Sequence, residues 1–276
     1  MRRVLNADFH KLWKDKVFRI AVALMFVIGA VMPVLHYINI VRTGYELPLE
    51  SGFFVYTVIM AIITAVVSAL FTGTEYSDGT IRNRLVVGHS RSSIYFSNLI
   101  VCITSGLIMC AAYILPYVTI GSCLEGFFRC GIKPIAVIVL VSLAAMIAFI
   151  AFFTAIAQLV PNKAYSAVAS ILLAGVLLIA GVYINSSLNE PKYYDAYSYT
   201  QNGVTQTEEA EANPNYLSGT KRQVYEFLYD FLPGCQVVQF VGMEVNSPKM
   251  LALYDFVLAA AAAGCGIIVF RRKDLK

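Results

Sequence analysis

Six long stretches of the chain are almost free of charged residues, and this feature constrains the fold more than any other. The first five contain no Lys, Arg, Asp or Glu, and the sixth contains only Asp255. They cover residues 20–41, 51–74, 92–124, 134–162, 164–189 and 251–270. Crossing the hydrocarbon core of a bilayer takes about 20 predominantly apolar residues. The sequence therefore predicts an all-α integral membrane protein with six transmembrane helices.

The composition agrees with lipid as the main solvent of the chain. Apolar residues make up 58% of the 276 residues and charged residues 14%, whereas a soluble domain has about 45–50% and about 25%. This excludes a soluble globular fold, and we expect no nucleic-acid partner. The first apolar stretch is longer than that of a cleavable signal peptide, so we expect it to be retained as a helix.

The distribution of Lys and Arg predicts which ends of the helices face the cytoplasm. Six spans place both termini on one side of the membrane. The segments on that side, at 1–19, 73–93, 163 and 271–276, contain 14 of the 21 basic residues, although the segments on the other side are longer in total. Lys and Arg are enriched in cytoplasmic segments. We therefore expect a multi-pass protein of the cell (plasma) membrane with both termini in the cytoplasm.

The N-terminal segment has an apolar helical face, and its charged residues fall mostly elsewhere. That face consists of Val4, Leu5, Phe9, Leu12 and Trp13. A basic amphipathic helix with Trp on its apolar side is typical of the membrane interface. Residues 1–19 are therefore predicted to form a cytoplasmic interfacial helix in contact with membrane lipid, which also serves as a charged topology anchor.

The spans divide the rest of the chain into three parts. Residues 20–184 contain spans one to five, with a polar cytoplasmic loop at 72–93. Residues 185–250 form an extracellular insertion, and residues 251–276 contain the sixth span and a cytoplasmic tail.

The extracellular insertion changes character along its length. Its first half is polar and rich in tyrosine (Tyr193, Tyr194, Tyr197 and Tyr199), and the role of this half is open. In its second half Val224, Phe227, Leu228 and Phe231 recur at helical spacing. Pro233-Gly234 ends that helix, and a second short apolar segment follows at 235–241. We expect an external cap, part loop and part amphipathic helix, that lies on the outer membrane surface and includes Phe227, Phe231 and Gln236.

No catalytic signature is present in the sequence. The chain has no Gly-Lys dipeptide and hence no phosphate-binding Walker loop, and it has no His-Glu pair that could begin a zinc-protease motif. Its three histidines, His10, His36 and His89, are dispersed. We therefore expect no catalytic residue, no metal site and no cofactor in this chain, so that energy must come from a partner or from an ion gradient.

Two features allow more than one interpretation. Asp255 is either an interfacial carboxylate paired with Lys249 or a backbone group, or part of a substrate or proton pathway. Cys123 and Cys130 flank a short external loop, where a disulfide is an open alternative to two free thiols.

The loop between spans two and three carries the functional hypothesis. It contains, in order, Glu75-Tyr76, Gly79-Thr80-Ile81-Arg82, Arg84-Leu85, Gly88 and Ser90-Arg91. A short helix that starts at Thr80 and is exposed to the cytosol suits contact with a soluble protein. The alternative is a solvated basic loop that only fixes the topology.

These residues resemble the first cytoplasmic loop of ABC transporter permeases of the type-2 exporter class. The resemblance covers nearly the whole chain. Residues 9–19 are similar to that family's interfacial helix, the six spans match in order, and the sequence Phe231-Leu-Pro-Gly-Cys-Gln236 is similar to bacterial members. His89 replaces the Pro expected before Ser-Arg, and residues 185–216 match nothing in the family pattern.

The resemblance implies a permease that pairs with a second copy of itself or with a related permease, and that rests on cytosolic ABC ATPase subunits, which would bind ATP and Mg. The loop would be the coupling helix. Its coupling residues would be Glu75, Tyr76, Gly79, Thr80, Ile81, Arg82, Arg84 and Leu85. Of these, the charged residues would make polar contacts, Ile81 and Leu85 would pack, and Gly79 would permit a sharp turn.

The resemblance also implies a central pathway lined by spans two and five. The polar candidates there are Thr57, Thr64, Ser68, Ser166 and Ser170, each of which can equally serve as a small residue that permits close helix contact. A secondary transporter, or a membrane sensor or immunity protein that binds an extracellular peptide, remain the alternatives to an ATP-driven exporter. The sequence does not identify the substrate.

Overall fold

The computed structural model describes residues 1–194, 196–201, 204–208 and 210–273. Within these residues six helices, one of them extended by a 3₁₀ turn, are long and apolar enough to cross a membrane. They are α2 (Lys16–Thr43), η1 (Leu49–Val55) with α3 (Tyr56–Ser77), α5 (Arg91–Glu125), α6 (Ile132–Leu159), α7 (Lys163–Leu188) and α10 (Pro248–Arg272). The prediction of an all-α integral membrane protein is confirmed, and the helix ends differ from the predicted ones by a few residues.

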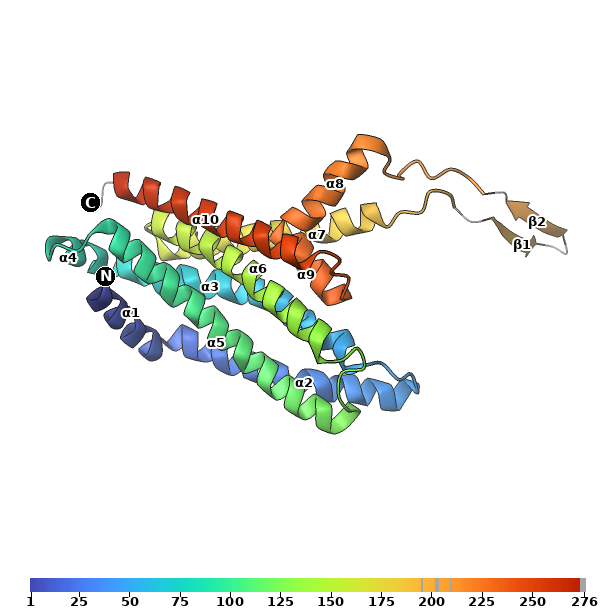
Figure 1. Cartoon of the computed structure of the whole chain (residues 1–276), viewed down its shortest axis with the longest axis horizontal. Coiled ribbons are helices and arrows are strands. Elements are labelled where there is room, and N and C mark those ends of the chain that lie inside the picture. The colour runs from blue at the N-terminus through green and yellow to red at the C-terminus, as the bar shows by residue number, and fades with distance from the viewer. Residues whose placement is uncertain (195, 202–203, 209, 274–276) are drawn as a thin grey trace.

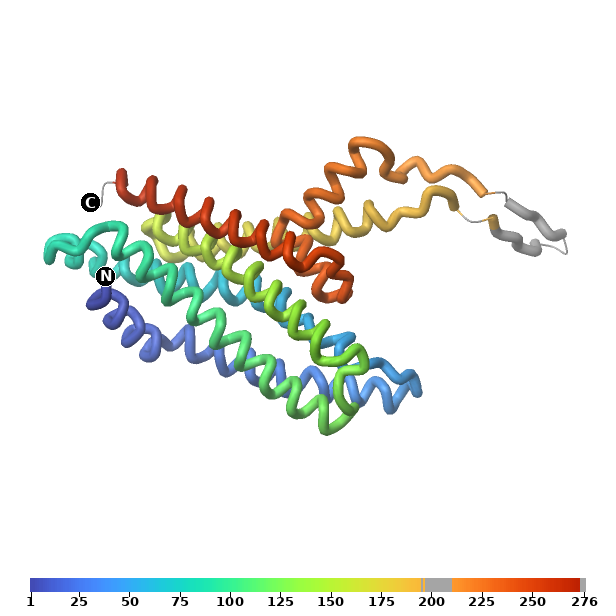
Figure 2. Tube along the Cα trace, viewed as in Figure 1, coloured from blue at the N-terminus to red at the C-terminus, as the bar shows by residue number. Residues whose placement is uncertain are grey.

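The long helices form one bundle in which α2 packs along α5, α3 packs between α6 and α7, and α6 packs along α10 (Figure 1). The trace in Figure 2 shows that the first and last helices bring the two chain ends to the same end of the bundle. The short helix α4 (Thr80–Val86) lies there too. We call this end of the bundle the terminal end, and the opposite end, from which the insertion extends, the outer end.

Helix α1 (Arg2–Lys14) lies at the terminal end and packs against α5. An extended residue, Asp15, separates it from α2, and its carboxylate caps α2 by accepting from the backbone N–H of Phe18 at 2.9 Å. The face of α1 that packs on the bundle contains Asp8 as well as apolar residues, whereas Trp13 is 60% exposed. The sequence analysis predicted that the charged residues of this segment lie mostly outside its apolar face; Asp8 is buried because it pairs with Arg84 of another helix.

At the outer end, buried acids hold the loops in place. The Glu50 carboxylate accepts from the backbone N–H groups of Arg129 and Cys130 at 3.2 and 2.9 Å. His36 on α2 lies 2.8 Å from the Glu125 carboxylate at the end of α5. These contacts connect α2, η1, α5 and the loop before α6. The thiol of Cys130, like that of Cys123, is free and exposed, so the structure contains two thiols here and no bridge.

The insertion contains an element that the sequence analysis did not predict. Strands β1 (Tyr197–Gln201) and β2 (Val204–Glu208) pair antiparallel, with Tyr197 opposite Glu208. The sequence signal was an Asn-Gly dipeptide at 202–203 between β-forming residues, a strong hairpin signature; these two positions lie outside the described residues.

The second half of the insertion forms two helices, α8 (Gly219–Phe231) and α9 (Pro233–Gly242), separated where Pro233-Gly234 predicted a break. Helix α8 buries none of its residues, as expected of a surface helix. Helix α9 instead packs inside the bundle against α6, α7 and η1, with Cys235 and Phe240 fully buried. The surface prediction was therefore wrong for α9, because its short apolar sequence is covered by neighbouring helices rather than by lipid headgroups.

Glycines allow α9 to approach α7. A Cβ atom added at Gly181 would overlap the carbonyl group of Gly234, and one added at Gly234 would overlap the carbonyl group of Leu177. Backbone therefore meets backbone at this crossing, as is common where small residues lie between membrane helices.

We predict that Gly181→Ala lowers the thermal unfolding temperature of the purified chain, because the added methyl group must push α9 away from α7. Gly175→Ala on the same helix is the matched control, since a Cβ there meets no atom within 4 Å. The control should be neutral or stabilising by up to about 1 kcal/mol through its higher helix propensity. Equal unfolding temperatures for the two variants would contradict the close crossing.

Candidate functional site

The turn between α3 and α4 has the geometry expected from its glycine. Gly79 has φ +65°, in the left-handed region, and immediately precedes Thr80 at the start of α4. The Thr80 hydroxyl donates to the carbonyl oxygen of Glu75 at 3.0 Å and so closes the turn. Because residues with a Cβ are strained at this φ, Gly79 fixes the direction in which α4 leaves the bundle.

Four charged side chains meet beneath α4: Asp8 and Lys11 from α1, Glu75 from α3 and Arg84 from α4. We call them the four-charge cluster. Arg84 pairs with Asp8 and lies 3.0 Å from Glu75 Oε1, and Lys11 Nζ lies 3.4 Å from the same oxygen. Both cations lie within ion-pair distance of Glu75 Oε1, but neither contact has the geometry of a hydrogen bond. The side chains of Asp8 and Glu75 are fully buried, and the two positive and two negative charges balance.

Helix α5 completes the cluster with two polar side chains. Asn98 Nδ2 donates to Glu75 Oε2 at 2.8 Å, and the Ser97 hydroxyl donates to Asp8. Lys11 also donates to the carbonyl oxygen of Phe71 at 3.0 Å. The cluster thus joins α1, α3, α4 and α5. Asp8, Lys11, Ser97 and Asn98 were not singled out from the sequence, because nothing in their local pattern indicates a partner dozens of residues away.

The two sides of α4 differ sharply. Ile81 is buried and Leu85 packs on the same core. Arg82 points outward, together with Val86 and Val87, which are 82% and 76% exposed. Of the charged residues predicted for this loop, Arg82 is therefore at the surface, whereas Glu75 and Arg84 belong to the four-charge cluster. The outward valines were not predicted.

Tyr76 belongs to a second set of contacts at the terminal end. Its hydroxyl donates to the carbonyl oxygen of Gln158, and Lys273 Nζ lies 3.2 Å from that hydroxyl. Lys273 also donates to the carbonyl oxygens of Gln158 and Leu159, at 3.2 and 3.0 Å. These are end carbonyls of α6, where a cation is favoured by the helix dipole. Partial burial lowers the pKa of Lys273 from its usual value.

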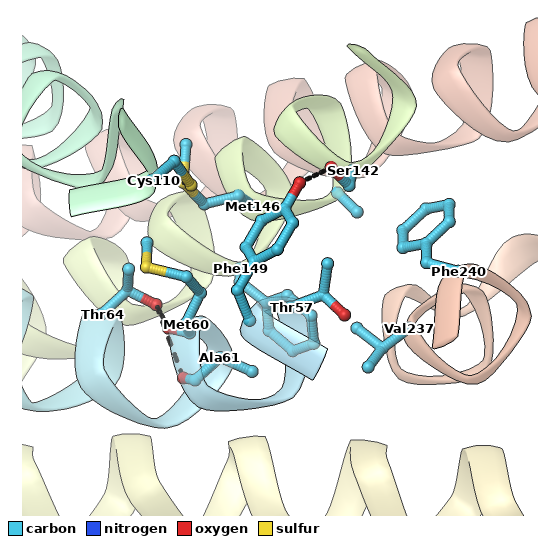
Figure 3. Close-up of a pocket in the computed structure, with 12 residues that line it drawn as sticks. Thr57, Met60, Ala61, Thr64, Cys110, Ser142, Met146, Phe149, Val237 and Phe240 are labelled. Carbon is cyan, nitrogen blue, oxygen red and sulfur yellow. Dashed lines mark hydrogen bonds between the residues drawn. The ribbon is translucent and has the colours of Figure 1, made fainter. Parts of the chain in front are cut away.

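Two of the predicted pathway residues line a small internal cavity between α3, α5, α6 and α9 (Figure 3). Thr57 and Thr64 donate to carbonyl oxygens of their own chain segment, at 2.8 Å to Phe54 and 2.6 Å to Met60. The cavity volume is about 10 Å³, barely enough for one water molecule. The interior at this level is therefore closed.

The other pathway candidates lie in helix contacts. Ser68 on α3 is 1% exposed, and Ser166 and Ser170 on α7 are fully buried. Helices α3 and α7 approach closely near this point, since a Cβ at Gly73 would overlap Lys163. None of these three serines lines the cavities described in this section.

A larger cavity opens at the outer end. It has a volume of about 420 Å³ and lies between α3, α7, α8 and α9. Asn185 and Tyr229 form part of its wall, joined by a hydrogen bond of 2.7 Å. Val237 of α9 lines both this cavity and the small internal one, so α9 separates a closed interior from an open outer cavity.

The residues predicted for the external cap lie in two places. Phe227 and Phe231 stack on each other, with ring centroids 5.2 Å apart, and both meet the ring of Tyr254 on α10. Gln236 is fully buried at the start of α9 and donates to the carbonyl oxygen of Asp230 at 2.9 Å. The aromatic residues thus hold α8 on α10, whereas Gln236 lies beneath the cap.

Comparison with known families gives one result. A profile described as ABC-2 family transporter protein matches residues 4–181, well over half of the chain. The chain belongs to this family. No curated protein sequence matches it significantly. Members of the ABC-2 family are membrane permeases that work with an ABC ATPase and do not themselves hydrolyse ATP. The matched region includes most of α1 and all of α3, α4 and α5, and hence every residue of the four-charge cluster.

We predict that Asp8→Ala destabilises this ABC-2 permease by about 3–5 kcal/mol, because it removes one of the two buried carboxylates that balance the partly buried cations Lys11 and Arg84. The control is Glu46→Ala, which breaks the ion pair between Glu46 and Arg129, whose side chains are 78% and 59% exposed, respectively. That change should cost less than about 1 kcal/mol. Unfolding of both variants in the same detergent measures the difference. A cost for Asp8→Ala as small as that of the control would contradict a buried, coupled cluster.

Proposed function

We propose that this chain is the permease subunit of an ATP-driven ABC exporter and that α4 is the helix on which a cytosolic ATPase acts. The observation that supports this most directly is the two-sided construction of α4. Its outer side presents Arg82, Val86 and Val87 to solvent, and its inner side is held by Arg84 in the four-charge cluster. An exposed apolar pair beside a cation is a good docking surface, since exposed apolar groups gain from burial.

The cluster provides a route for coupling. A displacement of α4 must carry Arg84 with it, and Arg84 is paired with Asp8 on α1 and Glu75 on α3. Separating these buried partners would leave unpaired charges at a cost of several kcal/mol. Moving the ends of α1, α3 and, through Asn98, α5 as one unit avoids that cost. ATP binding in the partner would therefore shift these helices together.

The proposed pathway runs along α3, α7 and α9. In this conformation the level of Thr57 and Thr64 is closed, and the cavity at the outer end is open. A shift of α3 against α7 and α9 would connect the internal cavity with the outer cavity. Substrate could then leave through the outer cavity, in the direction of export. The small serines Ser68, Ser166 and Ser170 would let α3 and α7 slide at close range.

The partners in this proposal are two ATPase subunits, which bind ATP and Mg, and a second permease, identical or related. Much of α7 is apolar and exposed: Leu172, Val176 and Ile179 are 63%, 62% and 71% exposed. Lipid or the second permease would cover this face. The terminal end faces the cytoplasm in this arrangement, as the excess of Lys and Arg at that end favours.

We predict that the double variant Arg82→Glu, Val86→Asp folds and inserts normally but loses ATPase binding, because both changes lie on the exposed side of α4. Co-purification in mild detergent and pull-down affinity measure this, and we expect at least about a tenfold loss, equal to about 1.4 kcal/mol. The matched control is Arg129→Glu, a charge reversal on an exposed side chain at the outer end.

The outcomes separate the functional classes. Loss of the ATPase from the α4 variant alone supports the permease proposal. Purification without any ATPase, under conditions that preserve a known ABC complex, would instead favour a carrier driven by an ion gradient or a sensor that binds an extracellular ligand.

The proposed orientation has a separate test. A membrane-impermeant maleimide applied to intact cells should label the exposed thiol of Cys130. In a variant that lacks the native cysteines, Val87→Cys should be labelled only after the membrane is permeabilised, because Val87 is exposed at the terminal end. The reverse pattern would invert the topology.

A further inference from the structure

Asp255 is the one acid that the sequence places inside the apolar stretch of the last span, and the contacts of its carboxylate differ from the expected ones. The residue is fully buried on α10, about 10 Å below the first residue of the helix at a rise of about 1.5 Å per residue. Neither carboxylate oxygen has a hydrogen-bond partner in the described part of the chain. Lys249, the partner suggested by the sequence, is exposed and makes no ion pair with it there.

The neighbour of this carboxyl group is Gln236 on α9. Its side chain lies against Asp255, its Nε2 donates to the carbonyl oxygen of Asp230, and its Oε1 is buried without a partner. Three oxygen atoms, two from Asp255 and one from Gln236, are therefore buried without a donor. A membrane-embedded acid in such a position is a candidate functional site, and the pathway proposed above does not use it.

The charged groups of the surrounding helices leave Asp255 without a counter-ion. The only charged residue of α6 is Lys133, at its exposed first turn. On α8, Arg222 pairs with Glu226, and Asp230 accepts from Gln239 at 3.4 Å, while partial burial raises its pKa from the usual value.

Further ionisable groups on the outer part of α8, α9 and α10 include phenols and a thiol; of these, Tyr229 on α8 donates to Asn185 on α7. Tyr254 on α10 lies in the aromatic contacts with α8, and Cys235 on α9 is a buried free thiol. On α5, which also packs on α10, Tyr95 approaches it at Gly266, farther toward the terminal end. An ionised carboxylate among these groups would cost several kcal/mol.

We propose that Asp255 and Gln236 form a proton-binding site, in which the protonated carboxyl group of Asp255 donates to Oε1 of Gln236 and so ties α9 to α10. One proton joins two of these three oxygens in an O–H···O hydrogen bond. A Ca²⁺ or Mg²⁺ ion would take about six or more oxygen ligands, and in the described part of the chain this site offers three unpartnered side-chain oxygens. Neither residue lines the small internal cavity or the larger outer cavity described above.

The site gives α9 a protonation-dependent attachment. When α9 and α10 are together, one proton is held between them. When they separate, water reaches the carboxyl group, which ionises and releases that proton, and closure takes one proton up again. If α9 moves during export, a consequence that rests on the proposed function, then opening of the outer end releases a proton and is favoured at higher external pH.

Infrared spectroscopy of the purified full-length chain tests the site without an ATPase. At neutral pH the difference spectrum between wild type and Asp255→Asn should contain the C=O stretch of a protonated carboxylic acid. Glu226→Gln is the matched control, because Glu226 is a solvent-exposed acid on the neighbouring helix α8; its difference spectrum should contain only carboxylate bands. Carboxylate bands at Asp255, or a change in its band on adding Na⁺, would overturn the proposal.

A second variant covers the case in which Asp255→Asn does not fold. Gln236→Leu keeps the acid and removes the acceptor, so the C=O band should move to the frequency of a carboxyl group without a hydrogen bond. An unmoved band would rule out the pairing. In the complex with its ATPase, Asp255→Asn should abolish the dependence of transport on external pH; a retained dependence would overturn the link to export but leave the infrared result standing.

Discussion

The buried contacts between Asp8, Glu75 and Arg84 are the interaction on which the terminal end of this protein depends. Helix α4 has seven residues, too few to be stable alone in water. Its position is set by the left-handed turn at Gly79 and by Arg84, which reaches two acids on two other helices. Because both acids are fully buried, the arrangement holds only while all partners stay in place. The amphipathic helix α1 is thereby part of the bundle.

The outer end is built on a different principle. There α9 enters the bundle by close backbone approach at Gly181 and Gly234, and α8 rests on α10 through aromatic rings. These contacts are mostly apolar, with a few hydrogen bonds beside them, such as those from Tyr229 to Asn185 and from Gln236 to the carbonyl oxygen of Asp230. Buried ion pairs at one end and largely apolar contacts of α8 and α9 at the other fit the proposed function, in which the ATPase acts on α4 and the change in access occurs around α9.

The six spans could be predicted from the sequence because lipid imposes a length and an apolar composition on each span separately. The sharp turn at Gly79 could also be predicted from the sequence, since the preference of glycine for a positive φ is a local property. The partners of Glu75 and Arg84 were not, because Asp8 and Asn98 lie far away in the chain and only the folded bundle brings them together. Helix α9 was placed on the surface for the same reason: its burial depends on α6 and α7, whose packing no local pattern specifies.

The use of charges rather than apolar residues beneath α4 has a physical consequence. An apolar contact tolerates small displacements at little cost, since dispersion and burial change gradually with distance. A buried ion pair does not, because a partner that leaves exposes an uncompensated charge to a low-dielectric interior. If the contacts under α4 were apolar, α4 could therefore be displaced without moving the helices beneath it. The four-charge cluster makes such an isolated displacement of α4 costly. A force on Arg82 and Val86 that moves Arg84 must therefore also move Asp8 and Glu75.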